Sequence, residues 1–393
     1  MKILWIPHAA WNIPQRAHAI CERLADEHTV HVTDWRFDLT GFADLAHGLR
    51  GTPLSGRTSN AMFVHRVPRI PGGLTVPALR ALNHRLYSSW VQRIVDLHRI
   101  DVVVGCFVAD PPVRCKLILD VCDHHSAYWR EYRNSPGYAR EIEAAEAKWL
   151  ERADAVVTVG HVLAERAAKF DRRPPDQIIT VVPNGVDIDR FRSVDRYSAR
   201  EALGIPREKK VVSLVGMFGE FAGLDLFVEA AAQLQRDDLI FLVVGDGVQM
   251  PVAKRIAHLH NLRSIRFVGR VPPAQVPLYL AATDVGVLSH RTSDFTAAAC
   301  PIKLIEYAAA GCTAVSTDLT EVRHMGFPNV VIVADTARDL AYGIDEALTR
   351  PFIAPPHLAQ YDSGYVTTAY HDLITSLPDS RAQITDTRPV AGA

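Results

Sequence analysis

The sequence predicts an α/β protein with two doubly wound domains, each built on a largely parallel sheet that helices cover on both faces. Short apolar, strand-like runs alternate with helical patterns along almost the whole chain. The runs are largely apolar throughout, which is typical of strands buried on both faces of a parallel sheet. With 393 residues, the chain is also too long for one ordinary hydrophobic core, so two domains are expected.

The expected strands form two series of six or seven, with helices between them. The strands of the first series are Lys2–Ile6, His28–Thr33, Met62–Val67, Asp101–Val104, Leu117–Val121, Ala155–Val159 and Ile178–Val182. Those of the second are Val211–Val215, Leu239–Val244, Ile265–Val268, Val285–Leu288, Thr313–Ser316 and Val330–Val333. The clearest helical patterns are Gln15–Glu27, Ala78–His98, Ala139–Arg152, Asp225–Leu234 and Val252–His260. Each of these helices lies between two strands, as a crossover between parallel neighbours requires.

The boundary between the two domains is expected near residue 190. The stretch from Asp189 to Arg207 is polar, carries little apolar periodicity and includes Pro206. Near the end of the chain, Ser363–Leu377 has the pattern of a last helix, and the polar residues after it are expected to be disordered. The expected divisions are an N-terminal domain at 1–190, a C-terminal domain at 191–355, a closing helical segment at 356–378 and a tail at 379–393.

Composition excludes some classes of protein. The 43 basic and 44 acidic residues give a formal net charge of −1, which argues against a nucleic-acid-binding protein. The six cysteines include no Cys-x-x-Cys and no tight cluster with histidines, so free thiols in a reducing compartment are expected. The apolar start of the chain stops at Pro7, and no apolar run approaches the roughly 18 residues that a transmembrane helix needs. We therefore expect a soluble, cytoplasmic protein.

The segment Pro301–Gly311 is the most informative motif in the chain. It follows one apolar strand, precedes another, and has a proline suited to a helix start and a glycine suited to the residue after a helix. Lys303 and Glu306 are three residues apart and so share a face of the first turns. A helix N-terminus with a cation and a carboxylate suits a phosphate beside a sugar hydroxyl. The alternative is an ordinary capped surface helix on which Glu306 pairs with Lys303.

The loops that follow the strands are the expected ligand-binding positions, because open parallel sheets bind ligands beyond the carboxyl ends of their strands. In the first domain these loops carry Trp11, the segment Cys122–Ser126 and the segment Pro183–Gly185. In the second domain they begin at Gly216, Gly245, Gly269, Ser289 and Asp318. Glycines at such positions let the backbone approach a nucleotide closely, although short glycine motifs also occur in plain turns.

Several motifs in order resemble the family 4 retaining glycosyltransferases of the GT-B fold. The segments that carry the resemblance are Arg152–Val156, Val181–Asp187 with Phe191, Val244–Gly247, Phe267–Val271, Tyr279–Val285 and Tyr361–Ser363. The resemblance spans nearly the whole chain. It implies two Rossmann-like domains that face a cleft, with a last helix crossing back to the N-terminal domain.

The sequence departs from the family pattern at two places. The family usually has two glutamates eight residues apart; Glu306 matches the second, but the first falls on Ala298, so Asp294 or another group would have to replace it. The family also usually has an arginine and a lysine after the first strand of the second domain. Here the segment Gly216–Gly223 has neither, and Glu220 adds a negative charge. Lys303, with Arg291 and Arg270, is the expected replacement, and a subset of the family carries this same P-x-K-L-x-E-Y-x-A-x-G motif.

The resemblance assigns roles to residues of both domains. Asp123, His124 and His125 are candidates for the reaction centre, with helix capping as the alternative for one of the histidines. Asn184 and Gly185 are expected at the hinge, with a plain turn as the alternative. On the acceptor side the candidates are Trp11, Gln15, Arg16 and Trp129. The candidates for donor binding are Glu306, Lys303, Leu304, Gly216, Gly245, Asp246, Arg270, Val271, Ser289, Arg291 and Asp294.

The implied activity is transfer of a sugar from a nucleotide-diphosphate sugar of the UDP, GDP or dTDP type to an acceptor hydroxyl, with retention at the anomeric carbon. The acceptor class stays open among a small molecule, a glycan and a lipid-linked molecule, and membrane contact is expected to be peripheral at most. No cofactor is expected. No metal is expected either, because Asp-x-Asp does not follow any of the expected strands except at the hinge. The alternatives are a catalytically silent binding protein on the same fold and a nucleotide-sugar epimerase.

Overall fold

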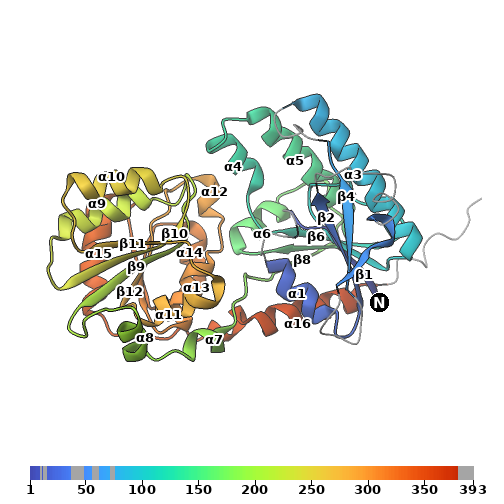
Figure 1. Ribbon diagram of the computed structural model, residues 1–393. Helices are drawn as coiled ribbons and strands as arrows, with labels where there is room; N and C mark the ends of the chain where they lie inside the picture. Colours follow the sequence, from blue (N-terminus) through green and yellow to red (C-terminus); the bar gives the residue numbers. More distant parts are fainter. Residues whose placement is uncertain (9–10, 12–15, 37–47, 55–61, 71–75, 379–393) are drawn as a thin grey trace, which may run out of the picture.

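Two α/β domains lie side by side in the computed structural model, each with one sheet between layers of helices (Figure 1). The structure describes residues 1–378 apart from 9–10, 12–15, 37–47, 55–61 and 71–75. Two parallel sheets with covering helices confirm the predicted fold class. The expected tail, residues 379–393, lies outside the described residues.

The N-terminal sheet has eight strands in the order β3-β4-β2-β1-β5-β6-β7-β8. They are β1 (Lys2–Trp5), β2 (Thr29–Arg36), β3 (Thr52–Leu54), β4 (Met62–Pro68), β5 (Val102–Gly105), β6 (Lys116–Val121), β7 (Ala155–Thr158) and β8 (Ile178–Val181). All pair in parallel except β3, which runs antiparallel to β4 at the edge of the sheet. The sequence did not predict β3, because three residues carry no readable periodicity.

The C-terminal sheet has six strands, all parallel, in the order β11-β10-β9-β12-β13-β14. They are β9 (Lys210–Met217), β10 (Leu239–Asp246), β11 (Ile265–Gly269), β12 (Val285–Leu288), β13 (Thr313–Thr317) and β14 (Val330–Val333). The strand order reverses between β9 and β12. In sheets of this kind the ligand crevice lies outside the carboxyl ends of the strands at that reversal.

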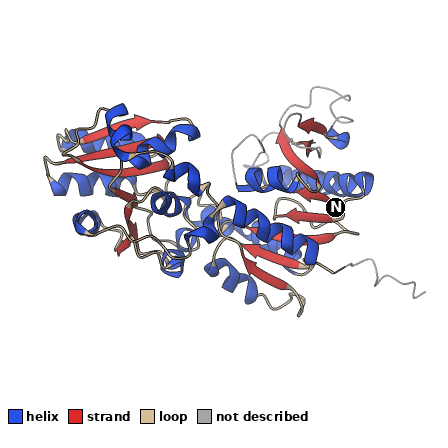
Figure 2. Ribbon diagram, turned by 90° about the horizontal axis from the view of Figure 1, so that it is seen from below, coloured by secondary structure: helices blue, strands red, loops and turns tan. Residues whose placement is uncertain are grey.

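Helices cover both faces of both sheets, as the view from below shows (Figure 2). In the N-terminal domain they are α1 (Arg16–Leu24), α3 (Pro77–His98), α4 (His125–Glu131), α5 (Pro136–Leu150) and α6 (His161–Ala168). The others are α7 (Ile188–Arg192), α8 (Arg196–Ala202), α9 (Leu224–Leu234), α10 (Met250–Leu259), α11 (Val276–Ala281), α12 (Asp294–Ala297), α13 (Ile302–Ala309), α14 (Thr320–Met325), α15 (Ala337–Thr349) and α16 (Ser363–Ser376). Among the described helices, none is both long and apolar enough to span a lipid bilayer.

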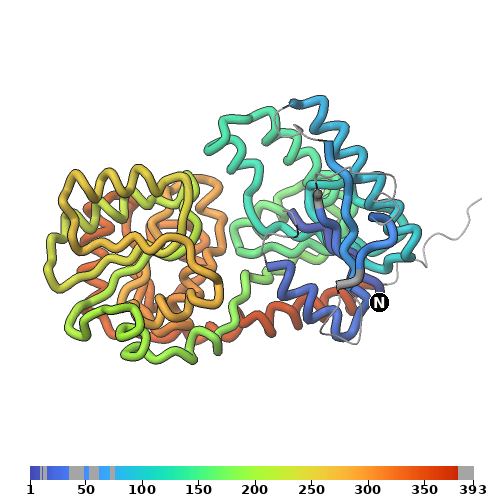
Figure 3. Tube along the Cα trace, viewed as in Figure 1, coloured from blue at the N-terminus to red at the C-terminus, as the bar shows by residue number. Residues whose placement is uncertain are grey.

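The chain crosses between the domains twice, and the two crossing segments lie against each other (Figure 3). The Val186 N–H donates to the Tyr361 carbonyl at 2.9 Å, and the Ser363 N–H donates to the Val186 carbonyl at 2.9 Å. A Cβ at Gly185 would lie 3.0 Å from the Ser363 Cα, so the glycine permits this close approach. After the second crossing, α16 packs against α1 of the N-terminal domain (Figure 1).

Each domain also provides a carboxylate to the start of a helix in the other. The Glu131 carboxylate, in α4, accepts hydrogen bonds from the N–H groups of Asp294 and Phe295 at 3.1 and 3.2 Å, where α12 begins. In the opposite direction, the buried Glu321 of α14 accepts from the Val162 N–H at 2.9 Å, where α6 begins. Helix N-termini have free N–H groups and favour anions, so both contacts stabilise the observed domain arrangement.

Candidate active site

Lys303 extends from the first turn of α13 to the carboxyl end of β9. A Cβ at Gly216 would lie 2.6 Å from the Lys303 Cε and 3.1 Å from its Nζ, so the lysine side chain lies directly over this glycine. Gly216 has a φ of +135°. It therefore adopts a backbone conformation that favours glycine, and it also leaves space for the lysine. The ammonium group consequently lies at the strand-order reversal of the C-terminal sheet.

A second glycine keeps the neighbouring strand end close to the first. Gly245, at the end of β10, has a φ of +134°, and a Cβ there would lie 1.8 Å from the Gly216 carbonyl oxygen. The exposed Asp246 accepts a hydrogen bond from the Gly247 N–H at 2.8 Å, so it shapes the turn that follows. The two strand ends thus present backbone rather than side chains beside Lys303.

Three polar side chains near this point lack protein partners. Lys303 and Glu306 form no ion pair with each other, and neither has a side-chain hydrogen bond to any residue that the structure describes. His290, which directly follows Ser289 at the end of β12, is buried, and both of its ring nitrogens lack a hydrogen-bond partner within the described part of the chain. Buried polar groups are nearly always hydrogen-bonded, so the unsatisfied His290 ring, with the half-buried Lys303 and Glu306 nearby, is typical of a ligand site.

Burial controls the charges of these three groups. It lowers the pKa of Lys303, and it lowers the pKa of His290 well below its usual value, an effect that the nearby Lys303 charge increases. Burial also raises the pKa of Glu306 to about 7, although Lys303 and Arg190 oppose the shift. His290 is therefore neutral near pH 7, with one ring nitrogen able to donate and the other able to accept a hydrogen bond.

The Glu306 shift predicts a pH-dependent stability difference. A group whose pKa is higher in the folded protein contributes most stability below its unfolded pKa of 4.5 and loses that contribution as the pH rises through about 7. Glutamine carries no charge, so Glu306→Gln removes the cost of burying an ionised carboxylate above that pH. We therefore expect the stability of the variant, relative to wild type, to increase between pH 5 and pH 8. The gain should be on the order of 1 kcal/mol because the side chain still reaches solvent. Melting curves of both proteins at pH 5 and pH 8 measure this gain. An equal stability difference between variant and wild type at the two pH values would contradict the prediction.

Other residues expected on the donor side have partners of their own. The Arg291 guanidinium donates to an Asp225 carboxylate oxygen at 2.5 Å, so it meets a ligand only by sharing or leaving that carboxylate. The Ser289 hydroxyl donates to the Ala222 carbonyl at 2.9 Å. Of the rest, Leu304 is buried in the core, Val271 is half-buried against it, and Arg270 and Asp294 are exposed.

The negative charge of Glu220 is neutralised from the other domain. An Arg133 guanidinium nitrogen lies 2.8 Å from the Glu220 carboxylate. Arg133 follows α4, so the pair joins the N-terminal domain to the loop after β9. The negative charge of Glu220, which would repel a diphosphate, is thus held in an ion pair between the two domains.

An aromatic cluster joins the two domains next to His290, and no motif in the sequence indicates it. Phe221 packs edge-on against the His290 ring with centroids 5.3 Å apart, and it also contacts Tyr132 at 5.9 Å. Phe295 of α12 lies 5.3 Å from the ring of Tyr128 in α4. Phe221 and Phe295 belong to one domain and the two tyrosines to the other. This aromatic contact therefore exists only in the folded, two-domain molecule.

The two histidines in the loop after β6 point in different directions. The His124 Nδ1 lies 3.4 Å from the Asp294 carbonyl oxygen across the domain boundary. The His125 ring turns into its own domain, toward Cys122, and burial lowers its pKa to about 3. Burial raises the pKa of Asp123 to about 7, against the opposing charge of Arg16. Only His124 and Asp123 therefore remain candidates for contact with a ligand in the interdomain region.

Arg16 holds together four elements near the hinge. It is the first residue of α1, and its guanidinium donates to the Tyr370 hydroxyl at 2.8 Å and to the Val182 carbonyl at 3.1 Å. It also lies 3.4 Å from the Asn184 Oδ1 and 3.9 Å from an Asp120 carboxylate oxygen. Arg16 is therefore a positioning residue, and it orders the hinge loop that contains Asn184.

The two tryptophans named for the acceptor side pack against different partners of their own domain. Trp11 is buried, stacks on His18 with ring centroids 3.8 Å apart, and donates its backbone N–H to Asp34 at 2.9 Å. Trp129 packs edge-on against Tyr138 with centroids 4.6 Å apart. Gln15 lies outside the described residues.

A pocket in the N-terminal domain lies between α3 and α5, near the ends of β4 and β5. It encloses about 390 Å³ and is lined by both apolar and charged side chains, among them an ion pair between Arg80 and Glu141, whose atoms are 2.7 Å apart. Phe107, on one wall, also contacts the ring of His125 with centroids 4.8 Å apart. The pocket wall is therefore continuous with the strand-end loop after β6.

Two family models match this chain, one for each domain. The model described as Glycosyltransferase Family 4 matches residues 14–190, and the model described as Glycosyl transferases group 1 matches residues 209–350. Together they span most of the chain. The chain belongs to the GT-B glycosyltransferases. One model covers most of the N-terminal domain and the other most of the C-terminal domain.

Solved structures share the GT-B fold at low sequence identity. Sucrose-phosphate synthase from Thermosynechococcus elongatus aligns with a TM-score of 0.74 at 16% identity, over 96% of this chain and 99% of that chain. HepE of Anabaena, determined in complex with UDP and glucose, aligns with a TM-score of 0.68 at 18% identity, over 96% and 100%. These likenesses establish the fold of the GT-B chain.

Curated relatives match this GT-B chain over part of its length. A protein named as a teichuronic acid biosynthesis glycosyltransferase, TuaH of Bacillus subtilis, is 30% identical over 48% of this chain and 46% of its own. A protein named as a colanic acid biosynthesis glycosyl transferase, WcaI of Escherichia coli, is 28% identical over 54% of each chain. The chain thus spans about half the length of these relatives.

Proposed function

We propose that the protein is a glycosyltransferase that moves a sugar from a nucleoside-diphosphate sugar to an acceptor hydroxyl. The observation that carries this proposal is the set of unpartnered groups at the strand-order reversal of the C-terminal sheet: Lys303, Glu306 and His290. A half-buried cation suits a diphosphate, a carboxylate suits the hydroxyls of a ribose, and a neutral imidazole suits the hydroxyls of a sugar.

Each of these residues has its own role in binding the donor or in the transfer. Lys303, at the start of α13, binds the diphosphate together with backbone N–H groups, without a metal ion there. Glu306 in its carboxylate form accepts hydrogen bonds from the ribose, and His290 orients the sugar. His124, on the opposite domain, faces the reaction centre. The sugar transfers with retention, and the leaving phosphate oxygen takes the proton of the acceptor hydroxyl, so that no protein base is needed.

A nucleotide panel tests this proposal. UDP, GDP, dTDP, ADP and CDP are added separately, and the melting temperature is measured. HepE, which shares the fold, binds UDP, so UDP is the first candidate. A ligand at about one hundred times its Kd stabilises a folded protein by about 2.7 kcal/mol. Stabilisation by one of these diphosphates supports the donor site. If none of them stabilises the protein, a catalytically silent binding protein is favoured. Conversion of the donor sugar without an acceptor would favour an epimerase.

We further propose that the pocket between α3 and α5 binds the acceptor. Ala145→Trp would fill part of it, so we expect the acceptor KM to rise at least about tenfold, equivalent to 1.4 kcal/mol of lost binding. The affinity for the nucleotide should be unchanged, because that site is on the other domain. Steady-state kinetics with the acceptor that wild type uses measures both quantities. A normal acceptor KM in the tryptophan variant would place the acceptor elsewhere.

A further inference from the structure

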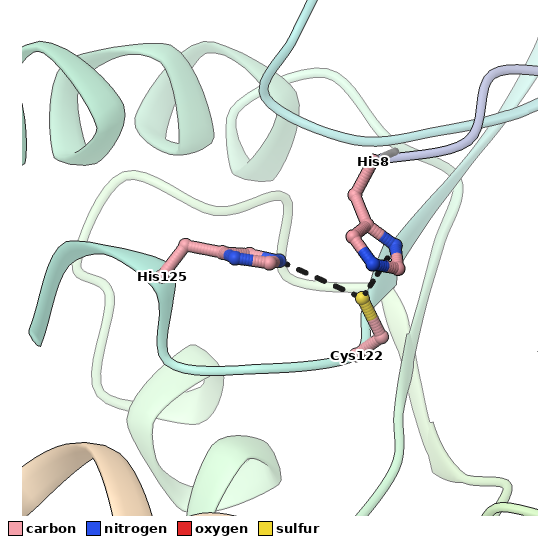
Figure 4. Close-up of side chains that lie close together, drawn as sticks. All are labelled: His8, Cys122 and His125. Atoms are coloured by element: carbon pink, nitrogen blue, oxygen red, sulfur yellow. Dashed lines mark hydrogen bonds between the residues drawn. The ribbon is translucent and has the colours of Figure 1, made fainter. Parts of the chain in front are cut away.

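His8, Cys122 and His125 form a cluster beyond the carboxyl ends of β1 and β6, the two strands that flank β5 in the N-terminal sheet (Figure 4). His8 comes from the loop after β1, Cys122 directly follows β6, and His125 is the first residue of α4. The Cys122 Sγ lies 3.2 Å from the His8 Nδ1 and 3.6 Å from the His125 Nε2. The sequence analysis found no cysteine–histidine cluster, because the fold supplies His8 from 114 residues away.

We propose that this cluster is a binding site for a zinc-class divalent ion. In tetrahedral zinc sites the metal lies about 2.3 Å from sulfur and about 2.1 Å from nitrogen, which separates the two ligand atoms by about 3.6 Å. The two measured separations are close to that edge length. A thiolate with two imidazoles selects zinc, cobalt or copper and disfavours magnesium and calcium, which prefer oxygen.

The surroundings favour a cation. His8 and His125 each direct a ring nitrogen at the Cys122 sulfur, and the three candidate ligand atoms all lie within 4.8 Å of one another. The carboxyl groups of Asp123 and Asp120 add negative charge near Cys122, which Arg16 balances in part. Binding forms the metal–sulfur bond and releases the thiol proton to solvent, so charge and protons balance.

A second cluster in the same domain, formed by His31, His65 and His98, has hydrogen-bond partners within the protein. His31 and His65 share a hydrogen bond of 2.8 Å between ring nitrogens, and the other His65 nitrogen pairs with the Gly48 carbonyl at 2.9 Å. His98 pairs with the Leu49 carbonyl at 2.8 Å. Protein hydrogen bonds account for these contacts, and no thiol lies in that cluster.

Three protein ligands leave a coordination position open. Structural zinc sites are closed by four protein ligands, whereas sites with three keep the fourth position for water or a bound molecule. The cluster is on the acceptor-side domain, and His125 contacts Phe107 of the proposed acceptor pocket. Phe107 thus connects the cluster to the wall of that pocket. The inference rests on the ligand geometry and stands even if the proposed function fails.

Cobalt titration of the metal-free, full-length protein tests the proposal. Co²⁺ reports both its ligands and its geometry, through a thiolate charge-transfer band in the near ultraviolet and intense visible bands when it is tetrahedral. We expect both signals to saturate at one equivalent and to disappear on addition of Zn²⁺. Titration to one equivalent without the thiolate band would overturn the assignment of Cys122 as a ligand.

Variants locate the site. Cys122→Ser should abolish the charge-transfer band, and His125→Gln and His8→Gln should each weaken Zn²⁺ binding at least about tenfold. Cys115→Ser is the matched control, since Cys115 is a free cysteine of the same domain outside the cluster. It should titrate like wild type. Circular dichroism of each variant separates loss of the site from loss of the fold. Wild-type behaviour of the correctly folded Cys122→Ser and His125→Gln variants would refute the proposal.

Discussion

Replacing Lys303 by alanine is expected to weaken nucleoside-diphosphate binding by about 2 to 3 kcal/mol, or roughly 30- to 150-fold. The half-buried ammonium lies over Gly216 without a partner among the described residues, so part of its desolvation precedes ligand binding. A hydrogen bond to a charged phosphate in such a place is stronger than one at the surface. Isothermal titration calorimetry with the diphosphate that stabilises wild type measures the loss.

Two controls separate the charge of Lys303 from the integrity of the domain. The corresponding nucleoside, which has no phosphate, should bind wild type and variant equally. Lys209→Ala removes a lysine just before the opposite end of β9 and should leave diphosphate binding unchanged. Equal diphosphate affinity in Lys303→Ala and wild type would remove Lys303 from the site.

Arg16→Met is expected to destabilise the protein by about 3 to 5 kcal/mol, because it leaves a buried carboxylate without its cation. The variant removes the donor to Tyr370 and Val182 and leaves Asp120, whose remaining described hydrogen bond is from the Tyr370 hydroxyl at 2.7 Å. Because Tyr370 belongs to α16, the loss also loosens the packing of the last helix on α1. Chemical denaturation at pH 7 measures the change.

A double variant and a surface variant serve as controls for Arg16. In Arg16→Met/Asp120→Asn the unpaired charge is gone, so this double variant should lose clearly less stability than the sum of the two single variants. Arg23→Met changes an exposed arginine of the same helix and should shift stability by no more than about 0.5 kcal/mol. Additive losses in the double variant would contradict the assigned role of the ion pair.

Sequence alone was sufficient wherever the signal was local. The alternation of strands and helices predicted both sheets, and the glycines after β9 and β10 were recognised as strand-end positions. Gly311 was expected after a helix and has a φ of +73° there. These features depend on a few consecutive residues and on the period of buried strands.

Features that depend on the meeting of distant segments were not predictable. His290 directly follows Ser289, which was named, but nothing in the sequence shows that no partner reaches its ring. The pairing of Glu220 with Arg133 joins two domains. Trp11 was expected to meet a ligand and instead stacks on His18 in the interior. The surroundings of these residues depend on how separate elements pack together, which no local pattern shows.

The exchanged helix caps give the separation of the two domains a free-energy cost at two places. Separating the domains would take Glu131 from the start of α12 and Glu321 from the start of α6, and caps of this kind contribute about 0.5 to 2 kcal/mol each. The same motion would leave two positively polarised helix ends exposed to solvent. The two caps therefore oppose separation of the domains from both sides of the interface.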